Sequence, residues 1–128
     1  MKHILLPTDF SENSWNAITY AIQLFKDDEC TFYLLNTYTP IIYNLEYVIG
    51  APAQFGLGDA LRSNSQNSLK ELKNRIMNRF PVNPSHSFKT RSRFDTLIGA
   101  IKEYVVKYPK LIIVMGTKGA TGAKEVLF

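Results

Sequence analysis

The sequence predicts an α/β fold in which an open, parallel β-sheet has helices on both faces. Short apolar runs of strand length alternate along the chain with stretches whose apolar residues recur every three or four positions. The resulting order is strand, helix, strand, helix, strand, helix, strand, and parallel neighbours require crossovers of helix length. The 128 residues suit a single domain. We expect the strand order 3-2-1-4, which places the first and fourth strands side by side.

The first strand and helix come at the N-terminus. Residues 3–7 (HILLP) are apolar and end at a proline, as expected for a buried strand that leads into a loop. Ser11 is placed to cap a helix over residues 12–26. The apolar stripe of that helix consists of Trp15, Ile18, Ile22 and Phe25.

The second strand is followed by an unusually long connection. Residues 31–38 (TFYLLNTY) are rich in aromatic and β-branched side chains, which favours a strand. Residues 39–58 are apolar but interrupted by prolines and glycines. Connections of this length in compact domains form lids, contact surfaces or disordered segments, and the apolar composition favours a contact surface.

The second half contains two helices and two strands. A helix that starts near Leu57 has an apolar stripe and ends at Pro81. Residues 86–93 alternate between cationic and other side chains, which is typical of a protected edge strand. Asp95 can cap the next helix, which Pro109 terminates, and residues 111–115 (LIIVM) form the fourth strand. The stripes of the two helices are Leu69, Leu72, Ile76 and Phe80, and Leu97, Ile98, Ile101, Val105 and Tyr108.

Composition excludes several classes of protein. No run of apolar residues approaches membrane-span length and no signal peptide is evident, so we expect a cytoplasmic protein without a membrane partner. The single cysteine, Cys30, cannot form an internal disulfide and is expected in the core, and no residue cluster has metal-ligand spacing. The net charge of +4 suits an anionic ligand but does not indicate nucleic acid.

Two loops have the chemistry of an anion site. PTDFS follows the first strand and GTKGATG follows the fourth. Adjacent first and fourth strands would bring both loops to one crevice, where glycines let backbone N–H groups approach a phosphate. The glycine spacing alone also fits an ordinary tight turn, and neither a Walker nor a GxGxxG fingerprint is present.

The segments ILLPTDFSENSWNAITYAIQLF, LLNTY and LIIVMGTKGATG together resemble the universal stress protein family. The resemblance implies a Rossmann-like sheet of the adenine nucleotide alpha hydrolase type. The nucleotide-binding branch has the pattern Gly, two residues, Gly, nine residues, Gly and then Ser or Thr. Gly116 and Gly119 match its first two glycines, and the third would follow Phe128. We therefore expect residues 1–128 to be one incomplete domain, without the fifth strand, of a longer or tandem parent.

The resemblance also implies site residues. Pro7, Thr8 and Asp9 would lie beside the adenine, and Thr37 would flank the base where many relatives have valine. Met115 and Gly116 match the ribose position, and Lys118 and Gly119 the phosphate-facing turn; Gly122 falls outside the family spacing. Phe94 departs from the glycine of many relatives and would shape the crevice. His3 and His86 lack the neighbours that catalysis needs.

The residues and the resemblance leave three functions open for this chain. The first is a stress-response regulatory domain that binds ATP, with or without magnesium, in the parent. The second is a nucleotide-independent interaction or dimerisation domain. The third is an enzyme, which we do not expect beyond slow ATP hydrolysis because no nucleophile, base or paired carboxylates are evident. We also expect a homodimer or other self-association, since a missing fifth strand would expose the fourth.

Overall fold

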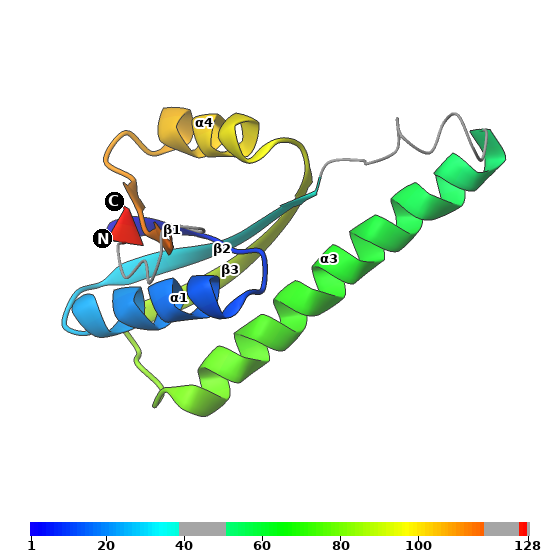
Figure 1. Ribbon diagram of the computed structural model, residues 1–128. Coiled ribbons are helices and arrows are strands. Elements are labelled where there is room, and N and C mark those ends of the chain that lie inside the picture. The colour runs from blue at the N-terminus through cyan, green and yellow to red at the C-terminus, as the bar shows by residue number, and fades with distance from the viewer. Residues whose placement is uncertain (39–50, 117–125, 128) are drawn as a thin grey trace.

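The computed structural model describes residues 1–38, 51–116 and 126–127, with backbone only over 51–57 and 126–127. Four parallel strands form one sheet in the order β3-β2-β1-β4, which confirms the predicted fold class and strand order. Helices α1 and α3 lie on one side of the sheet and α4 on the other (Figure 1). The elements are β1 Lys2–Pro7, α1 Glu12–Leu24, β2 Cys30–Tyr38, α3 Ala51–Arg79, β3 His86–Phe94, α4 Leu97–Lys107, β4 Ile112–Ile113, β5 Met115–Gly116 and β6 Val126–Leu127.

The central strands β1 and β2 supply residues to both faces of the sheet. Successive side chains of a strand point to opposite faces, so Ile4 and Leu6 join the core under α1 and α3, whereas Leu5 joins the core under α4. All three side chains are fully buried. Strands that are apolar on both faces need helices on both, which explains the layered architecture.

Cys30 begins β2 and is fully buried, as the sequence predicted. Burial raises the pKa of its thiol above the ordinary value. The thiol therefore behaves as a small apolar core group. Among the described residues, no helix combines the length and the apolar character that a membrane crossing requires.

The helix caps are partly as predicted. Ser11 caps α1, because its Oγ accepts a hydrogen bond from the backbone N–H of Ser14. The predicted cap of α4 was wrong by one residue: Thr96, not Asp95, is the N-cap, and its Oγ1 accepts from Gly99 N–H at 3.1 Å. Asp95 instead accepts from Thr96 N–H at 2.7 Å. Both residue types can cap, and only the backbone path decides between them.

Helix α3 is longer than the sequence predicted. It begins at Ala51 rather than near Leu57, so the last part of the expected connection is helical. Pro52 is compatible with this because proline lacks only an N–H that is unpaired in a first helical turn. The N-terminal part of α3 projects beyond the sheet, while its C-terminal part packs on β2 and β3 (Figure 1). Residues 39–50 lie outside the described part of the chain.

The fourth strand is interrupted. Only Ile112–Ile113 pair with β1, and Val114 N–H still donates to Leu5 O at 3.0 Å. The chain then leaves the sheet, and Met115–Gly116 pair antiparallel with Val126–Leu127. The predicted single strand over 111–115 is therefore two short strands in two sheets. At the other side, β3 is an edge strand as predicted.

Candidate functional site

A cavity of about 380 Å³ opens where β1 and β2 end and where β5 begins. Carboxyl ends of parallel strands meet at one end of a sheet, and β1 lies between β2 and β4. The helix after β1 and the helix before β4 cover opposite faces, so a crevice forms at this switch point. We call it the carboxyl-end cavity; its lining is Pro7, Thr8, Asp9, Ser11, Asn13, Ser14, Leu35, Thr37, Leu97, Met115 and Gly116.

The loop after β1 is folded by its own side chains. Asp9 Oδ1 accepts hydrogen bonds from the backbone N–H of Ser11, at 3.0 Å, and from the Ser11 hydroxyl. Such a turn is a local alternative to secondary structure that aspartate favours. It directs the first turn of α1 to the cavity, where the unpaired N–H groups and positive dipole end of a helix suit a negative charge.

The Thr8 hydroxyl makes its hydrogen bonds within the protein. Ser14 Oγ donates to Ser11 O at 2.8 Å, which uses its one proton. In the 2.9 Å contact between the two hydroxyls, Thr8 Oγ1 is therefore the donor and Ser14 Oγ the acceptor. Thr8 Oγ1 also accepts from Phe10 N–H at 3.0 Å. Thr8 holds the loop against α1 and has no hydroxyl proton left to donate to a ligand.

Phe10 has an unusual backbone conformation. Its φ of 66° lies in the left-handed region, which is uncommon for any residue other than glycine, asparagine or aspartate. The hydrogen bond from its N–H to Thr8 maintains this conformation. The loop thus holds backbone strain beside the cavity.

A buried hydrogen-bonded chain supports the same loop from beneath. Asn36 Nδ2 donates to Thr8 O at 2.8 Å, and Ser65 Oγ donates to Asn36 Oδ1 at 2.7 Å. Ser92 Oγ donates in turn to Ser65 Oγ at 2.6 Å. These hydrogen bonds join β3, α3 and β2 to the end of β1. Sequence reasoning missed it, although an asparagine within the apolar strand TFYLLNTY was a usable signal.

Gly116 is required by close packing. A Cβ at this position would lie 2.9 Å from the backbone oxygen of Asn13 in α1. From the sequence, this glycine is expected to admit a ligand, and in the structure it also admits the close approach of α1. Because the obstacle is backbone, a larger residue at position 116 requires α1 or β5 to move.

Six of the eight predicted site residues line the carboxyl-end cavity: Pro7, Thr8, Asp9, Thr37, Met115 and Gly116. Lys118 and Gly119, like Gly122, lie outside the described residues. The prediction for Phe94 was wrong, because it packs edge-on against Tyr38 and is absent from the cavity lining. Arg93 forms an ion pair with Glu103.

The two histidines also lie elsewhere. His3 hydrogen-bonds the Tyr33 hydroxyl at 2.8 Å and stacks on Tyr108, and His86 hydrogen-bonds Phe25 O. Sequence reasoning did not identify Ser11, Asn13, Ser14, Leu35 and Leu97 as cavity residues. Leu35 lies on β2, two residues before Thr37, and the positions of the other four follow from the approach of α1 and α4 to the strand ends.

Comparison with known proteins supports the fold. Universal stress protein MJ0531 of Methanocaldococcus jannaschii is 26% identical in an alignment of 129 residues that covers 98% of this chain and 70% of that protein. Universal stress protein UspA from Lactobacillus plantarum has a similar structure, with a TM-score of 0.66, 18% identity and coverage of 92% of this chain and 80% of that one.

Another solved structure and a family sequence model also match this chain. The hypothetical protein MJ0577, whose structure served to assign its biochemical function, has a TM-score of 0.69 and 22% identity over 99% of this chain and 82% of its own. The sequence model of the universal stress protein family matches residues 1–128. The chain therefore belongs to the universal stress protein family.

Proposed function

We propose that this stress-response domain is a cytoplasmic regulatory module that binds an adenine nucleotide in the carboxyl-end cavity. The observation that carries the proposal is the convergence of Pro7, Asp9, Thr37 and Met115 on one cavity beside the N-terminus of α1. Its volume of about 380 Å³ is in the range of small-molecule sites.

The residues present fit such a ligand. Thr37 and Met115 offer largely apolar surface for a base, Leu35 is fully buried beside them, and Asp9 and the α1 terminus offer polar groups. Gly116 keeps the backbone close to α1, so the space beside it is narrow. The phosphates would extend toward Lys118 and Gly119, as the family pattern implies. Binding would stabilise the conformation that binds, which is sufficient for a signalling role.

Calorimetric titration with magnesium-ATP tests the proposal. It is done on this chain and on a version extended past Phe128 through the expected third glycine and its Ser or Thr. We expect Thr37→Trp to fill the cavity and to cost about 1–3 kcal/mol of binding, or about five- to 150-fold in affinity. Tyr38→Trp is the matched control, since Tyr38 follows Thr37, points to the other face and is absent from the cavity lining. The proposal fails if neither chain binds.

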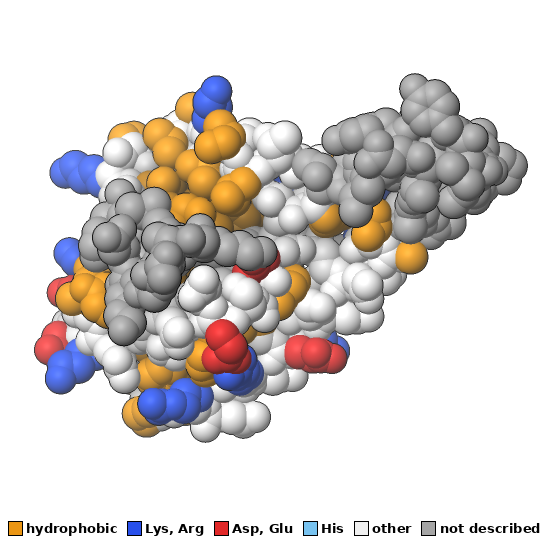
Figure 2. Space-filling model, in the orientation of Figure 1, with side chains coloured by type: hydrophobic (Ala, Val, Ile, Leu, Met, Phe, Trp, Pro, Cys, Tyr) orange, Lys and Arg blue, Asp and Glu red, His pale blue; other side chains and the backbone are white. Residues whose placement is uncertain are grey.

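The second candidate, an interaction or dimerisation domain, is favoured by one observation. Ile98, Val105 and Val106 on α4 are 64%, 45% and 82% exposed. Figure 2 shows hydrophobic side chains gathered over this helix. Exposed apolar patches usually mark contact surfaces. Sedimentation equilibrium of the chain and of I98K/V106K would test it: self-association that the double variant abolishes supports this candidate, and a monomeric wild-type chain contradicts it.

A further inference from the structure

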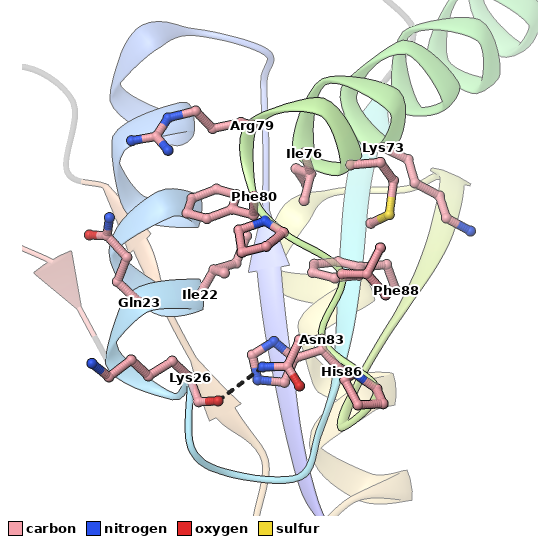
Figure 3. A pocket seen from close by; sticks show the side chains of 14 residues that line it. Ile22, Gln23, Lys26, Lys73, Ile76, Arg79, Phe80, Asn83, His86 and Phe88 are labelled. Atoms are coloured by element: carbon pink, nitrogen blue, oxygen red, sulfur yellow. Dashed lines mark hydrogen bonds between the residues drawn. The ribbon is translucent and has the colours of Figure 1, made fainter.

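The opposite end of the sheet contains a second, larger pocket. It has a volume of about 490 Å³ and lies where α1 and α3 end and β3 begins. Figure 3 shows its side chains, which come from both helices, from the loop 80–85 and from β3. We call it the amino-end pocket. It shares no lining residue with the carboxyl-end cavity.

The interior of the amino-end pocket is apolar. Ile22 and Ile76 form part of the core beneath it, and Phe80 and Phe88 pack against that core. Met77, on α3, is 45% exposed. Phe80, Ile22 and Phe88 lie around the centre of the view in Figure 3. An apolar, concave lining of this size is typical of sites for small ligands.

The polar groups of the interior are already paired within the protein. Asn83 Nδ2 donates to Lys26 O at 2.9 Å, and Asn83 Oδ1 accepts from Ser85 N–H at 2.9 Å. His86 Nε2 lies 2.9 Å from Phe25 O, and because a carbonyl only accepts, the imidazole is the donor. Two carbonyl groups that follow α1, those of Phe25 and Lys26, are thereby paired. A ligand in the pocket would not meet these two oxygens unpaired.

The charges at the rim have one sign. Lys26, Lys73 and Arg79 line the pocket, and no Asp or Glu is among the lining residues in the described part of the chain. Within the described residues, none of the three forms an ion pair. Arg79 lies over the ring of Phe80, 4.9 Å from its centroid. In Figure 3, Lys26 and Lys73 lie on opposite sides of the apolar cluster.

We propose that the amino-end pocket binds a small amphipathic carboxylate, such as a medium-chain fatty acid. The apolar tail would contact Ile22, Met77, Phe80 and Phe88, and the carboxylate would remain at the rim, where a cationic side chain can pair with it. Charge complementarity selects an anion over a neutral apolar compound. This site is independent of the nucleotide proposal, because it lies at the other end of the strands.

The three methionines of the chain allow a direct test. Met77 lines the amino-end pocket, Met115 lines the carboxyl-end cavity, and Met1 lines neither. In protein labelled with ¹³C at the methionine methyl groups, octanoate should shift the Met77 signal saturably and leave that of Met115 in place. Octanol, of equal chain length but uncharged, should bind at least about fivefold more weakly.

Charge-reversal variants distinguish an effect on octanoate binding from an effect on the stability of the fold. The variant K26E/K73E should weaken octanoate binding by about tenfold or more. The control K102E/K110E makes the same change in net charge at two exposed positions outside the pocket and should bind as the wild type. An unchanged Met115 signal verifies that each variant is folded.

Four results would overturn the proposal. They are the absence of a saturable Met77 shift, equal binding of octanoate and octanol, equal weakening by both charge reversals, and parallel shifts of Met77 and Met115. A Met77 shift that depends on protein concentration without ligand would assign the pocket to a second copy of the chain instead. Magnesium-ATP, read at Met115, tests the nucleotide proposal in the same sample, so the two proposals can fail separately.

Discussion

The two ends of the sheet differ in how their polar groups are used. At the carboxyl end, hydroxyl, amide and carboxylate groups hold a strained loop, as in the bonds of Thr8 to Ser14 and of Asn36 to Thr8. At the amino end, Asn83 and His86 pair with the carbonyl groups that follow α1. The first end presents a cavity whose lining combines apolar side chains with hydroxyl, amide and carboxylate groups, and the second presents an apolar pocket with a cationic rim.

Helix direction accounts for much of this difference. In a parallel sheet with helical crossovers, helices begin at the carboxyl end of the strands and end at the amino end. Unpaired N–H groups and positive dipole ends therefore collect at one end of the sheet, and carbonyl groups and negative dipole ends at the other. Cations such as Arg79, in the last turn of α3, complement the second end. The same sheet can thus offer two sites of different chemistry.

The largest expected effect comes from Gly116→Val. A Cβ there would lie 2.9 Å from Asn13 O, so α1 must shift. We expect a loss of about 1–3 kcal/mol in the free energy of unfolding, measured by urea denaturation, and loss of detectable ATP binding. Octanoate should still shift Met77. Loss of both responses would show that the two ends are not independent.

Gly58→Ala is the control for this substitution. A Cβ at Gly58 in α3 would meet nothing within 4 Å. Alanine is the better helix former, so we expect a gain of about 0.5–1 kcal/mol in the free energy of unfolding. Equal destabilisation by the two substitutions would contradict the packing argument for Gly116.

Asn36→Leu tests the buried hydrogen-bonded chain. The change removes the donor to Thr8 O and the acceptor of Ser65, both in buried positions. We expect a loss of about 1–3 kcal/mol in the free energy of unfolding, because buried polar groups are left without partners. Ser92→Ala, which removes only the half-buried end of the chain, should cost less. A larger loss of unfolding free energy on Ser92→Ala than on Asn36→Leu would contradict the central role given to Asn36 in this hydrogen-bonded chain.

The smallest effect is expected for Phe10→Asn. Asparagine tolerates the left-handed conformation that Phe10 adopts, and the Phe10 side chain is already 38% exposed. We expect a gain of about 0.5–1 kcal/mol in the free energy of unfolding, measured by urea denaturation. Phe94→Asn, also at an exposed phenylalanine but within β3, should not stabilise. A loss of stability on Phe10→Asn would show that the ring contributes more than the backbone costs.

Much of the carboxyl-end cavity could be predicted from sequence because its residues follow strands. The loops after residues 3–7 and 111–115 had to meet once the strand order was known, and Pro7, Thr8, Asp9, Met115 and Gly116 line one cavity. The contributions of α1 and α4 could not be predicted, since they depend on how closely each helix approaches the sheet. Family resemblance, not spacing, identified Thr37.

The amino-end pocket was not predicted at all. Its residues come from the ends of α1 and α3, from the loop 80–85 and from β3, and nothing in their local sequence links them. Ile76 and Phe80 appeared in the sequence only as part of an apolar helix stripe. Whether such a stripe is fully covered depends on the neighbouring helix, and here α1 and α3 leave a space between their C-terminal ends.

The sequence by itself determined the order of strands and helices, the parallel sheet and the loops that meet at its carboxyl end. These features follow from local periodicity, turn residues and the need for helical crossovers, which short stretches of chain encode. Only the tertiary structure decided the longer α3, the Thr96 cap, the break after Val114, the helix residues of the carboxyl-end cavity and the amino-end pocket. The cavities depend on contacts between segments distant in the chain, and the Thr96 cap depends on the backbone path, which local sequence preference leaves open.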